Sequence, residues 1–275
     1  MVKEIETFFR KYFPKRLENK NLYQNLLKGK KGIEIGGPSQ IFSSKGILPF
    51  YDFVESLDGV NFSNETVWEG AINEGKNYKY GNRIGYQYVM DSVNLSGIDS
   101  NTYDFLLSCH SLEHIANPLK ALNEWKRILK PEGYLLVILP HKDKTFDHIR
   151  PVTELQHIIA DFKNDVGEDD QTHFNEVINL HDLKLDEGLA NREHLIERVS
   201  NNYSNRCLHQ HVFNARLVAE LLDYAGLKIL DLSVMYHNIL SLSQKDKYDK
   251  QSNNVYFLKS NLLYSNPDYP SDFTN

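Results

Sequence analysis

The sequence predicts an α/β fold in which parallel strands alternate with helices, and three segments carry that prediction. Residues 32–39 are a short apolar run that ends in a glycine pair. Residues 51–58 form a second apolar run that ends in an acid. Residues 103–140 pass from an apolar strand through an amphipathic helix into another apolar strand. Strands that alternate with helical patterns are typical of βαβ units and a parallel sheet.

The first segment, Gly-Ile-Glu-Ile-Gly-Gly-Pro-Ser, predicts a strand and a tight turn. Glycine lets the backbone turn and approach a ligand where a Cβ would clash. A glycine turn after the first parallel strand is where doubly wound folds bind nucleoside cofactors. Plain strand-to-helix turns carry the same pattern, so this segment alone does not define a site.

The second segment supplies an acid about 20 residues further on, where nucleotide-binding folds place a carboxylate for a ribose diol. A carboxylate suits a diol because it offers two acceptor oxygens. Asp58 is the first choice and Glu55 the second. A solvated acid at the end of a strand gives the same pattern.

The third segment is the most specific. Pro118 suits the first turn of a helix. Apolar residues then recur at helical spacing, at Leu119, Leu122, Trp125, Ile128 and Leu129. Pro131 and Gly133 end the helix, and residues 134–140 predict a buried strand.

Two motifs within this segment give a resemblance to a known family. Ser-Cys-His-Ser-Leu-Glu-His ends the strand at 108–114, and Arg-Ile-Leu-Lys-Pro-Glu-Gly ends the helix at 127–133. In these motifs the chain resembles the class I S-adenosylmethionine-dependent methyltransferases of the small-molecule kind (methyltransferase type 11). The resemblance covers residues 30–140 and resumes at 212–260. It implies a doubly wound, Rossmann-like, seven-stranded sheet whose last strand is antiparallel, with S-adenosylmethionine as the cofactor.

The resemblance also assigns residues to the methionine end of the cofactor. Glu34, Gly36 and Gly37 match the loop beside that end. The chain departs from the family at the third glycine, because Pro38 and Ser39 stand there.

The nucleoside end of the cofactor is assigned in the same way. The resemblance implies that Asp58 holds the ribose hydroxyls and that Asp91 meets the adenine amino group. It places Ser108 and His110, at the end of the fourth strand, alongside the cofactor.

Composition narrows the function. A formal charge of −6 and a pI near 6.0 disfavour nucleic acid as a partner, since binding it needs a basic surface. The two cysteines, Cys109 and Cys207, make no disulfide framework and indicate an intracellular protein, with the cytoplasm as the default. The sequence has no apolar run of membrane-spanning length and no cleavable leader, so no membrane partner is expected. The oligomeric state stays open.

The 275 residues suit a single domain with additions. Residues 1–28 predict an N-terminal helical cap. After a helix at 212–224, residues 227–235 and 255–259 predict the last two strands as an antiparallel hairpin. Residues 261–275 predict a loosely ordered tail.

A polar insertion at 141–210 follows the fifth strand, and long insertions in compact domains are usually functional. Eight of the eleven histidines lie between 141 and 211, although each alone is more typical of a structural role. Ligands bind outside the carboxyl ends of strands, so His141 and His110 are the candidate catalytic residues, with His141 the leading general base. His110 alternatively forms part of the cofactor wall.

The start of the insertion supplies candidate substrate contacts. Asp147 and His148 are expected to orient one another, and Arg150 to bind a phosphate or carboxylate bidentately. A plain loop hydrogen-bond network is the equal alternative. No metal is assigned, because the histidines and acids of the insertion match no familiar zinc spacing.

A sulfonium cofactor and a histidine base favour O-methylation of a small polar acceptor. A sugar, a phosphorylated or nucleotide-linked sugar, or a precursor of a surface polysaccharide is the expected class. The alternatives are an N-methyltransferase acting on a small molecule and a binding protein for S-adenosylmethionine without catalysis. A nicotinamide-dependent oxidoreductase is disfavoured because G-x-G-x-x-G is absent from the sequence.

Overall fold

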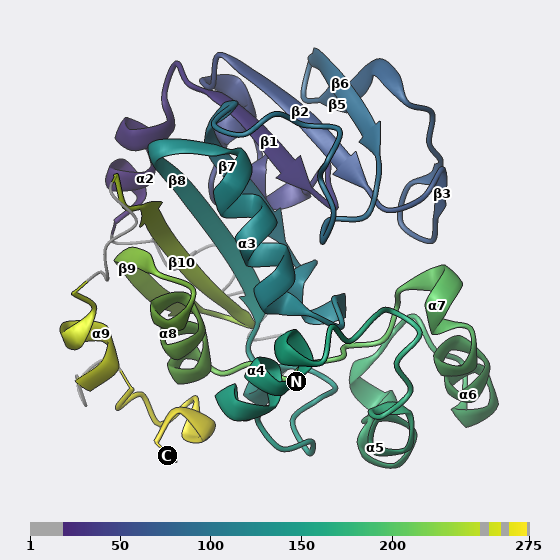
Figure 1. Cartoon of the computed structure of the whole chain (residues 1–275). Helices are drawn as coiled ribbons and strands as arrows, with labels where there is room; N and C mark the ends of the chain where they lie inside the picture. Colours follow the sequence, from purple (N-terminus) through teal and green to yellow (C-terminus); the bar gives the residue numbers. More distant parts are fainter. Residues whose placement is uncertain (1–18, 248–252, 260–263, 274–275) are drawn as a thin grey trace.

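The computed structural model describes residues 19–247, 253–259 and 264–273, which form a three-layer α/β fold (Figure 1). Its eight-stranded sheet has the order β5-β6-β2-β1-β7-β8-β10-β9. The strands are β1 Lys31–Ile35, β2 Ser56–Asn61, β5 Gly75–Tyr80, β6 Arg83–Val89, β7 Tyr103–Cys109, β8 Leu129–Pro140, β9 Leu227–Met235 and β10 Asn238–Lys245. A separate ribbon pairs β3 Glu65–Thr66 with β4 Gly70–Ala71.

The predicted doubly wound sheet is confirmed, with one strand more than expected. Strands β6, β2, β1, β7 and β8 are parallel neighbours. The last strand, β10, is antiparallel to both β8 and β9. The additional strand, β5, pairs antiparallel with β6 at the edge of the sheet. The carboxyl ends of the parallel strands therefore meet at one edge, where ligands bind in such folds.

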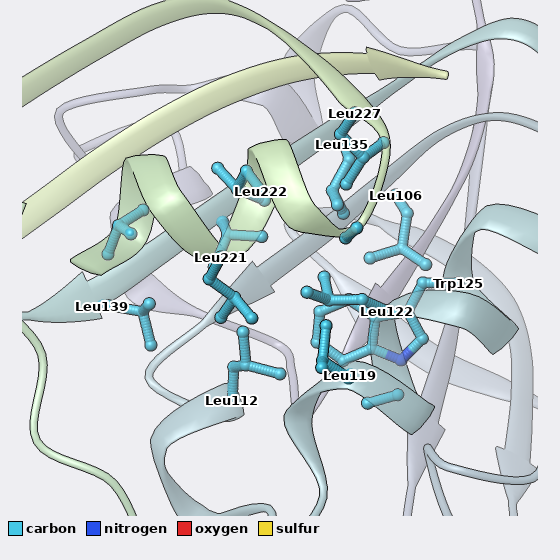
Figure 2. Packing of buried hydrophobic residues seen from close by; sticks show 14 of the residues in the cluster. Leu106, Leu112, Leu119, Leu122, Trp125, Leu135, Leu139, Leu221, Leu222 and Leu227 are labelled. Atoms are coloured by element: carbon cyan, nitrogen blue, oxygen red, sulfur yellow. The ribbon is translucent and has the colours of Figure 1, made fainter. Parts of the chain in front are cut away.

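Helices α3 Pro118–Ile128, α4 Leu155–Lys163 and α8 Ala215–Tyr224 cover one face of the sheet (Figure 1). The apolar stripe predicted for α3 packs there, with Trp125 fully buried among leucines of α3, α8 and the strands (Figure 2). The other face is covered by α2 Lys20–Leu27 and by the segment 39–54, whose apolar side chains form a second core. Two cores, one on each face, hold the sheet edge that carries the site.

The predicted N-terminal cap is described only in part, because residues 1–18 lie outside the described residues. Helix α2 covers the second face of the sheet through Tyr23 and Leu27, which are fully buried. The Tyr23 hydroxyl donates a 2.5 Å hydrogen bond to Asp231 of β9. This bond ties the cap to the antiparallel edge of the sheet.

The prediction of a strand at 255–259 is wrong, because those residues form the short helix α9 Val255–Lys259. The partner of β9 is β10, and only two residues separate the end of β9 from the start of β10. Tyr236, in that two-residue turn, has a positive φ of 57°. Such turns usually carry Gly or Asn, and the sequence offers no such marker, so the hairpin was placed too late.

The tail differs from the expected loose segment in its described part. Tyr264, Tyr269 and Asp272 are at most 3% exposed. The Tyr269 hydroxyl donates to the backbone carbonyl of Tyr236, 2.7 Å away. Residues 264–273 therefore pack onto the domain next to the β9–β10 turn.

The insertion after β8 folds mainly into helices: α4 as above, α5 Phe174–Leu180, α6 Arg192–Ser200 and α7 Asn202–Asn205. Helices α5, α6 and α7 lie beyond the carboxyl edge of the sheet (Figure 1). Helices α5 and α6 share a small apolar core built on Val177, Leu195 and Val199. Among the described residues, we find no helix with the length and apolar character needed to cross a membrane.

Candidate active site

A cavity of about 380 Å³ opens at the carboxyl edge of the sheet. Its lining includes Gly36 after β1, Asn61 at the end of β2, Asp91 after β6 and His110 after β7. The location is the one that the parallel topology predicts for a nucleoside ligand. Three of these four residues were expected from the sequence; Asn61 was not.

The turn after β1 needs both of its glycines. Gly36 has a φ of +75°, and a Cβ there would collide with Ser111. A Cβ on Gly37 would lie well under 3.0 Å from Glu34 and from the Tyr78 hydroxyl. Because neither residue has a side chain, the backbone of this turn can approach a ligand in the cavity closely.

Glu34 supports this turn from behind rather than lining the cavity. Its fully buried carboxylate accepts hydrogen bonds from the hydroxyls of Tyr51 and Tyr78, both 2.7 Å, and from the Ser39 amide, 2.9 Å. Burial raises the pKa of Glu34, and the three donors oppose that rise. Glu34 was predicted to contact the cofactor, but its side chain does not line the cavity and instead holds the turn in place.

Asp58 also lies outside the cavity lining. It sits within β2, opposite Ile33, and accepts hydrogen bonds from the Tyr103 hydroxyl and the Tyr86 amide. The strand begins at Ser56 rather than at Tyr51 and ends at Asn61. The residue at the strand end is therefore Asn61, whose side-chain amide donates to the Gly37 carbonyl at 3.1 Å.

The loop after β6 and the insertion meet over the cavity. Asp91 lines it, and the Arg206 guanidinium lies 3.3 Å from the Asp91 carboxylate. Arg206 also lies over the ring of Phe62, 5.2 Å from its centre. Ser108, expected beside the cofactor, is a fully buried residue of β7 and does not line the cavity.

A second cavity of about 680 Å³ adjoins the first on the side of the insertion. Trp68, His110 and His114 line both cavities, so they form the junction. His110 is held by a 2.7 Å hydrogen bond between its Nε2 and Asn238 Oδ1. Burial lowers the pKa of His110 to about 4, so its ring is neutral near pH 7.

His141, the predicted base, does not reach either cavity. Its side chain has no exposed surface. Its Nε2 lies 3.2 Å from Asp272 Oδ2, and its Nδ1 accepts from the Asp143 amide. The ring of Tyr269 packs against it. The described tail thus covers the end of β8, and His141 fastens that tail instead of meeting an acceptor.

Asp147 and Arg150 form a buried hydrogen-bond network. The sequence analysis gave such a network as the alternative to a substrate-binding role. Asp147 Oδ1 lies 2.9 Å from Arg150, and Asp147 Oδ2 lies 2.5 Å from Nδ1 of His209. Arg150 is 1% exposed and also pairs with Glu176 at 2.7 Å, so it is not placed to bind a substrate anion. His148 instead pairs with Asp182 at 3.0 Å, away from both cavities.

His209 is the functional candidate that the sequence analysis missed. It lines the second cavity, and its Nδ1 is engaged by Asp147. His209 and Arg150 hold the pKa of Asp147 well below its ordinary value, against the effect of burial. A neutral histidine whose Nδ1 donates to a carboxylate has a basic Nε2. The contact with Asp147 therefore fixes the orientation of the His209 ring at the wall of the cavity.

Glu113 is a second titratable group in this cavity. It has no exposed surface, and neither carboxylate oxygen has a hydrogen-bond partner among the described residues. Burial raises its pKa to about 7, while His209 opposes the rise. A buried acid without partners is poised to donate or accept a proton near neutral pH.

Glu113 should make the stability of the protein depend on pH. Because its pKa is higher in the folded chain, folding takes up a proton between the two pKa values, and stability falls as pH rises through that window. Between about pH 5 and pH 8, the wild type should lose on the order of 2 kcal/mol of unfolding free energy relative to Glu113→Gln. Urea unfolding of both proteins at the two pH values measures this. A constant difference between them would contradict it.

In the part of the chain that the structure describes, two groups of side chains bring metal-ligating atoms within 4.8 Å of one another. The first group is His157, His173 and His211, and the second is Glu113, His114 and His209. The second group lines the larger cavity, whereas the first lies outside both cavities.

Residues 46–137 match the family model described as a methyltransferase domain. This span is about a third of the chain and contains β2, α3, most of β8 and most of the cavity lining. The match identifies a methyltransferase domain over these residues, and the sheet order and the glycine turn at the cavity agree with the class I fold that the resemblance implies. S-adenosylmethionine is the cofactor that this resemblance implies, and the cavity has the glycine turn expected beside it.

Among curated proteins, an uncharacterized protein of Methanocaldococcus jannaschii is 54% identical over 43 residues, which is 16% of this chain. The chain spans about a fifth (19%) of that relative's length.

Three solved structures to which the chain is similar come from a bacterium, an archaeon and a second bacterium. A protein of Listeria monocytogenes named as an S-adenosylmethionine-dependent methyltransferase is 12% identical, with a TM-score of 0.47 over 84% of this chain and 96% of that chain. A complex of a Haloferax volcanii methyltransferase with its activator Trm112 is also 12% identical, with a TM-score of 0.47 over 89% and 95%. A Burkholderia thailandensis N-methyltransferase with bound S-adenosylhomocysteine is 10% identical, with a TM-score of 0.41 over 89% and 86%.

Proposed function

We propose that this protein methylates a hydroxyl group of a small, neutral, polar acceptor, with His209 as the general base. The observation that carries the proposal is the junction of the two cavities at Trp68, His110 and His114. One cavity has the glycine turn for the cofactor, and the other is lined by His209, whose Nδ1 contacts Asp147. Methyl transfer needs this arrangement, because donor and acceptor must meet in line.

The residues of the second cavity account for the proton. S-adenosylmethionine, when bound, supplies a methyl group on a sulfonium that is already activated for transfer. His209 would take the hydroxyl proton of the acceptor on Nε2 as the methyl group is transferred. Asp147 remains ionised and stabilises the resulting imidazolium. The products would be S-adenosylhomocysteine and the methyl ether of the acceptor, and His209 would hold the released proton.

In the first cavity, the carboxylates of the described lining are Glu69 and Asp91. We assign Asp91 to the adenine amino group and the strand-end residue Asn61, together with Glu69, to the ribose. Phe62 lies in the same lining, with the Arg206 guanidinium over its ring. Asn61 in place of an acid weakens one expected ribose contact, and Glu69 supplies a carboxylate from the segment between β3 and β4.

The second cavity indicates the class of acceptor. Its lining is rich in hydrogen-bonding side chains, including Asn201, Asn205 and His194. Its one Arg or Lys among the described lining residues, Arg198, already pairs with Asp186 at 2.7 Å. This arrangement favours a neutral polyol over the phosphorylated acceptor expected from Arg150. Trp68, 55% exposed at the junction, offers a flat apolar face for a sugar ring.

Calorimetric titration with S-adenosylmethionine tests the cofactor assignment. Asp91→Asn should weaken binding about tenfold or more, since a hydrogen bond to a charged group contributes about 1.5–3 kcal/mol. Asp58→Asn is the matched control and should bind as the wild type does, because Asp58 lies outside the cavity. Titration with NADH should show no binding.

Methyl transfer itself is tested by S-adenosylhomocysteine release with a panel of neutral sugars, nucleotide sugars and sugar phosphates. Turnover with the neutral members, and an O-methylated product by mass spectrometry, are the expected results. Binding of S-adenosylmethionine without turnover on any hydroxyl compound, but with turnover on amines, would overturn the O-methylation assignment.

A further inference from the structure

We propose that His157, Asp161, His173 and His211 bind one divalent transition-metal ion, best matched by zinc, that fastens the insertion to the core. The four residues come from three separate segments. His157 and Asp161 lie one turn apart on α4, His173 immediately precedes α5, and His211 lies just before α8. Residues four apart on a helix share a face, so α4 presents two ligands together.

The distances fit a metal centre. His157 Nε2 lies 3.1 Å from His173 Nε2 and 3.4 Å from Asp161 Oδ2. Ligating atoms of the three histidines all lie within 4.8 Å of one another. Two ligands at about 2.0–2.1 Å from a tetrahedral zinc ion are roughly 3.3 Å apart. The two shorter contacts therefore already have the spacing of a bound set.

Two buried atoms at this cluster have no hydrogen-bond partner among the described residues, and each would be satisfied by a metal. The His211 ring is 1% exposed, and its Nε2 lies 3.2 Å from the Ala116 carbonyl. Nε2 therefore carries the proton, and the unpartnered Nδ1 holds a lone pair. A backbone carbonyl that fixes the tautomer of a ligating histidine is the usual outer contact of such sites. The second atom without a hydrogen bond is Asp161 Oδ2, which lies 3.4 Å from His157 Nε2 and 3.8 Å from His211 Nε2.

The donor set selects the kind of ion and its role. Three imidazoles and one carboxylate suit zinc, whereas magnesium and calcium prefer oxygen ligands. Four protein ligands in a tetrahedral set make a closed, structural centre. The centre would join α4, the start of α5 and the segment before α8 to Ala116, which lies just before α3. It also fixes the chain two residues from His209, so it would position the base without contacting the reactants.

The competing arrangement is a metal-free histidine cluster. A proton shared between His157 and His173, with Asp161 as the counter-charge, would also bring their nitrogens together. This arrangement leaves His211 Nδ1 buried without a partner, which a metal does not. It also predicts no response to added metal.

The experiment uses the full chain without a polyhistidine tag. Elemental analysis of the purified protein should find about one zinc ion per chain. Removal of the metal with a chelator should lower Tm by several degrees, and a stoichiometric addition of Zn²⁺ should restore it. Substitution with Co²⁺ should give the visible spectrum of a tetrahedral site.

Variants decide between the two arrangements. His157→Gln changes a half-exposed ring, so the chain should fold while its zinc content and its Tm response to chelator are lost. His148→Gln, whose exposed ring pairs with Asp182, is the control and should keep both. Wild-type protein that has no metal and no Tm shift with Zn²⁺, Co²⁺ or Ni²⁺ would overturn the proposal. Full zinc content in the His157→Gln or the His173→Gln variant would overturn the proposal as well. Neither outcome depends on methyl transfer.

Discussion

His209→Gln is expected to lower kcat about 10²- to 10⁴-fold while leaving the affinity for S-adenosylmethionine nearly unchanged. Glutamine retains a polar group of similar reach but cannot take up the hydroxyl proton. The cofactor cavity is not lined by His209, so its binding contacts should persist. Steady-state kinetics with an acceptor found by the screen, together with calorimetry, measure the two quantities separately.

The partner of His209 gives a second readout. Asp147→Asn should also lower kcat, because the amide no longer favours the tautomer with a basic Nε2. It also leaves Arg150 paired only with Glu176, so its unfolding must be measured alongside. His148→Gln serves as the control histidine and should have wild-type kcat.

Retained turnover in His209→Gln would reject His209 as the base. The pH profile would then separate the two remaining candidates in the cavity. The pKa of Glu113 lies near 7 and that of His110 near 4. A rate that rises with pH through about 7 would indicate Glu113, and one already on its plateau at pH 6 would indicate His110.

The sequence predicted the sheet and the site edge well, for a physical reason. Buried strands and the α3 stripe are encoded locally, by apolar periodicity, and the carboxyl ends of parallel strands must meet. Gly36, Asp91 and His110 were therefore placed near a common cavity before any contact was known. Asp58 was misplaced because the apolar run at 50–54 forms a 3-10 turn and a core, which shifts the strand by several residues.

The base could not be chosen from the sequence, because its identity depends on contacts between distant segments. His141 does end β8, as predicted, but Asp272 and Tyr269 of the tail, about 130 residues later, cover it. His209 becomes a candidate only because it meets Asp147, 62 residues earlier. The same holds for the four proposed metal ligands, whose spacing matches no local motif.

Gly37→Ala is expected to weaken S-adenosylmethionine binding at least tenfold and to lower the unfolding free energy by about 1–3 kcal/mol. The new Cβ would overlap the Glu34 carboxyl group and the Tyr78 hydroxyl, both fully buried and neither at the end of a free side chain. Relief of that overlap must move the turn or separate Glu34 from a donor. Calorimetry and urea unfolding measure the two effects.

Gly29→Ala separates crowding from backbone strain. Gly29 has a φ of +68° but open space around a Cβ. Its substitution should therefore cost only about 1 kcal/mol of stability, from the left-handed backbone, and leave cofactor affinity intact. Equal cofactor affinity in Gly37→Ala and the wild type would contradict the placement of the turn against the cofactor. It would mean that the network of Glu34, Tyr51 and Tyr78 stabilises the fold without shaping the site.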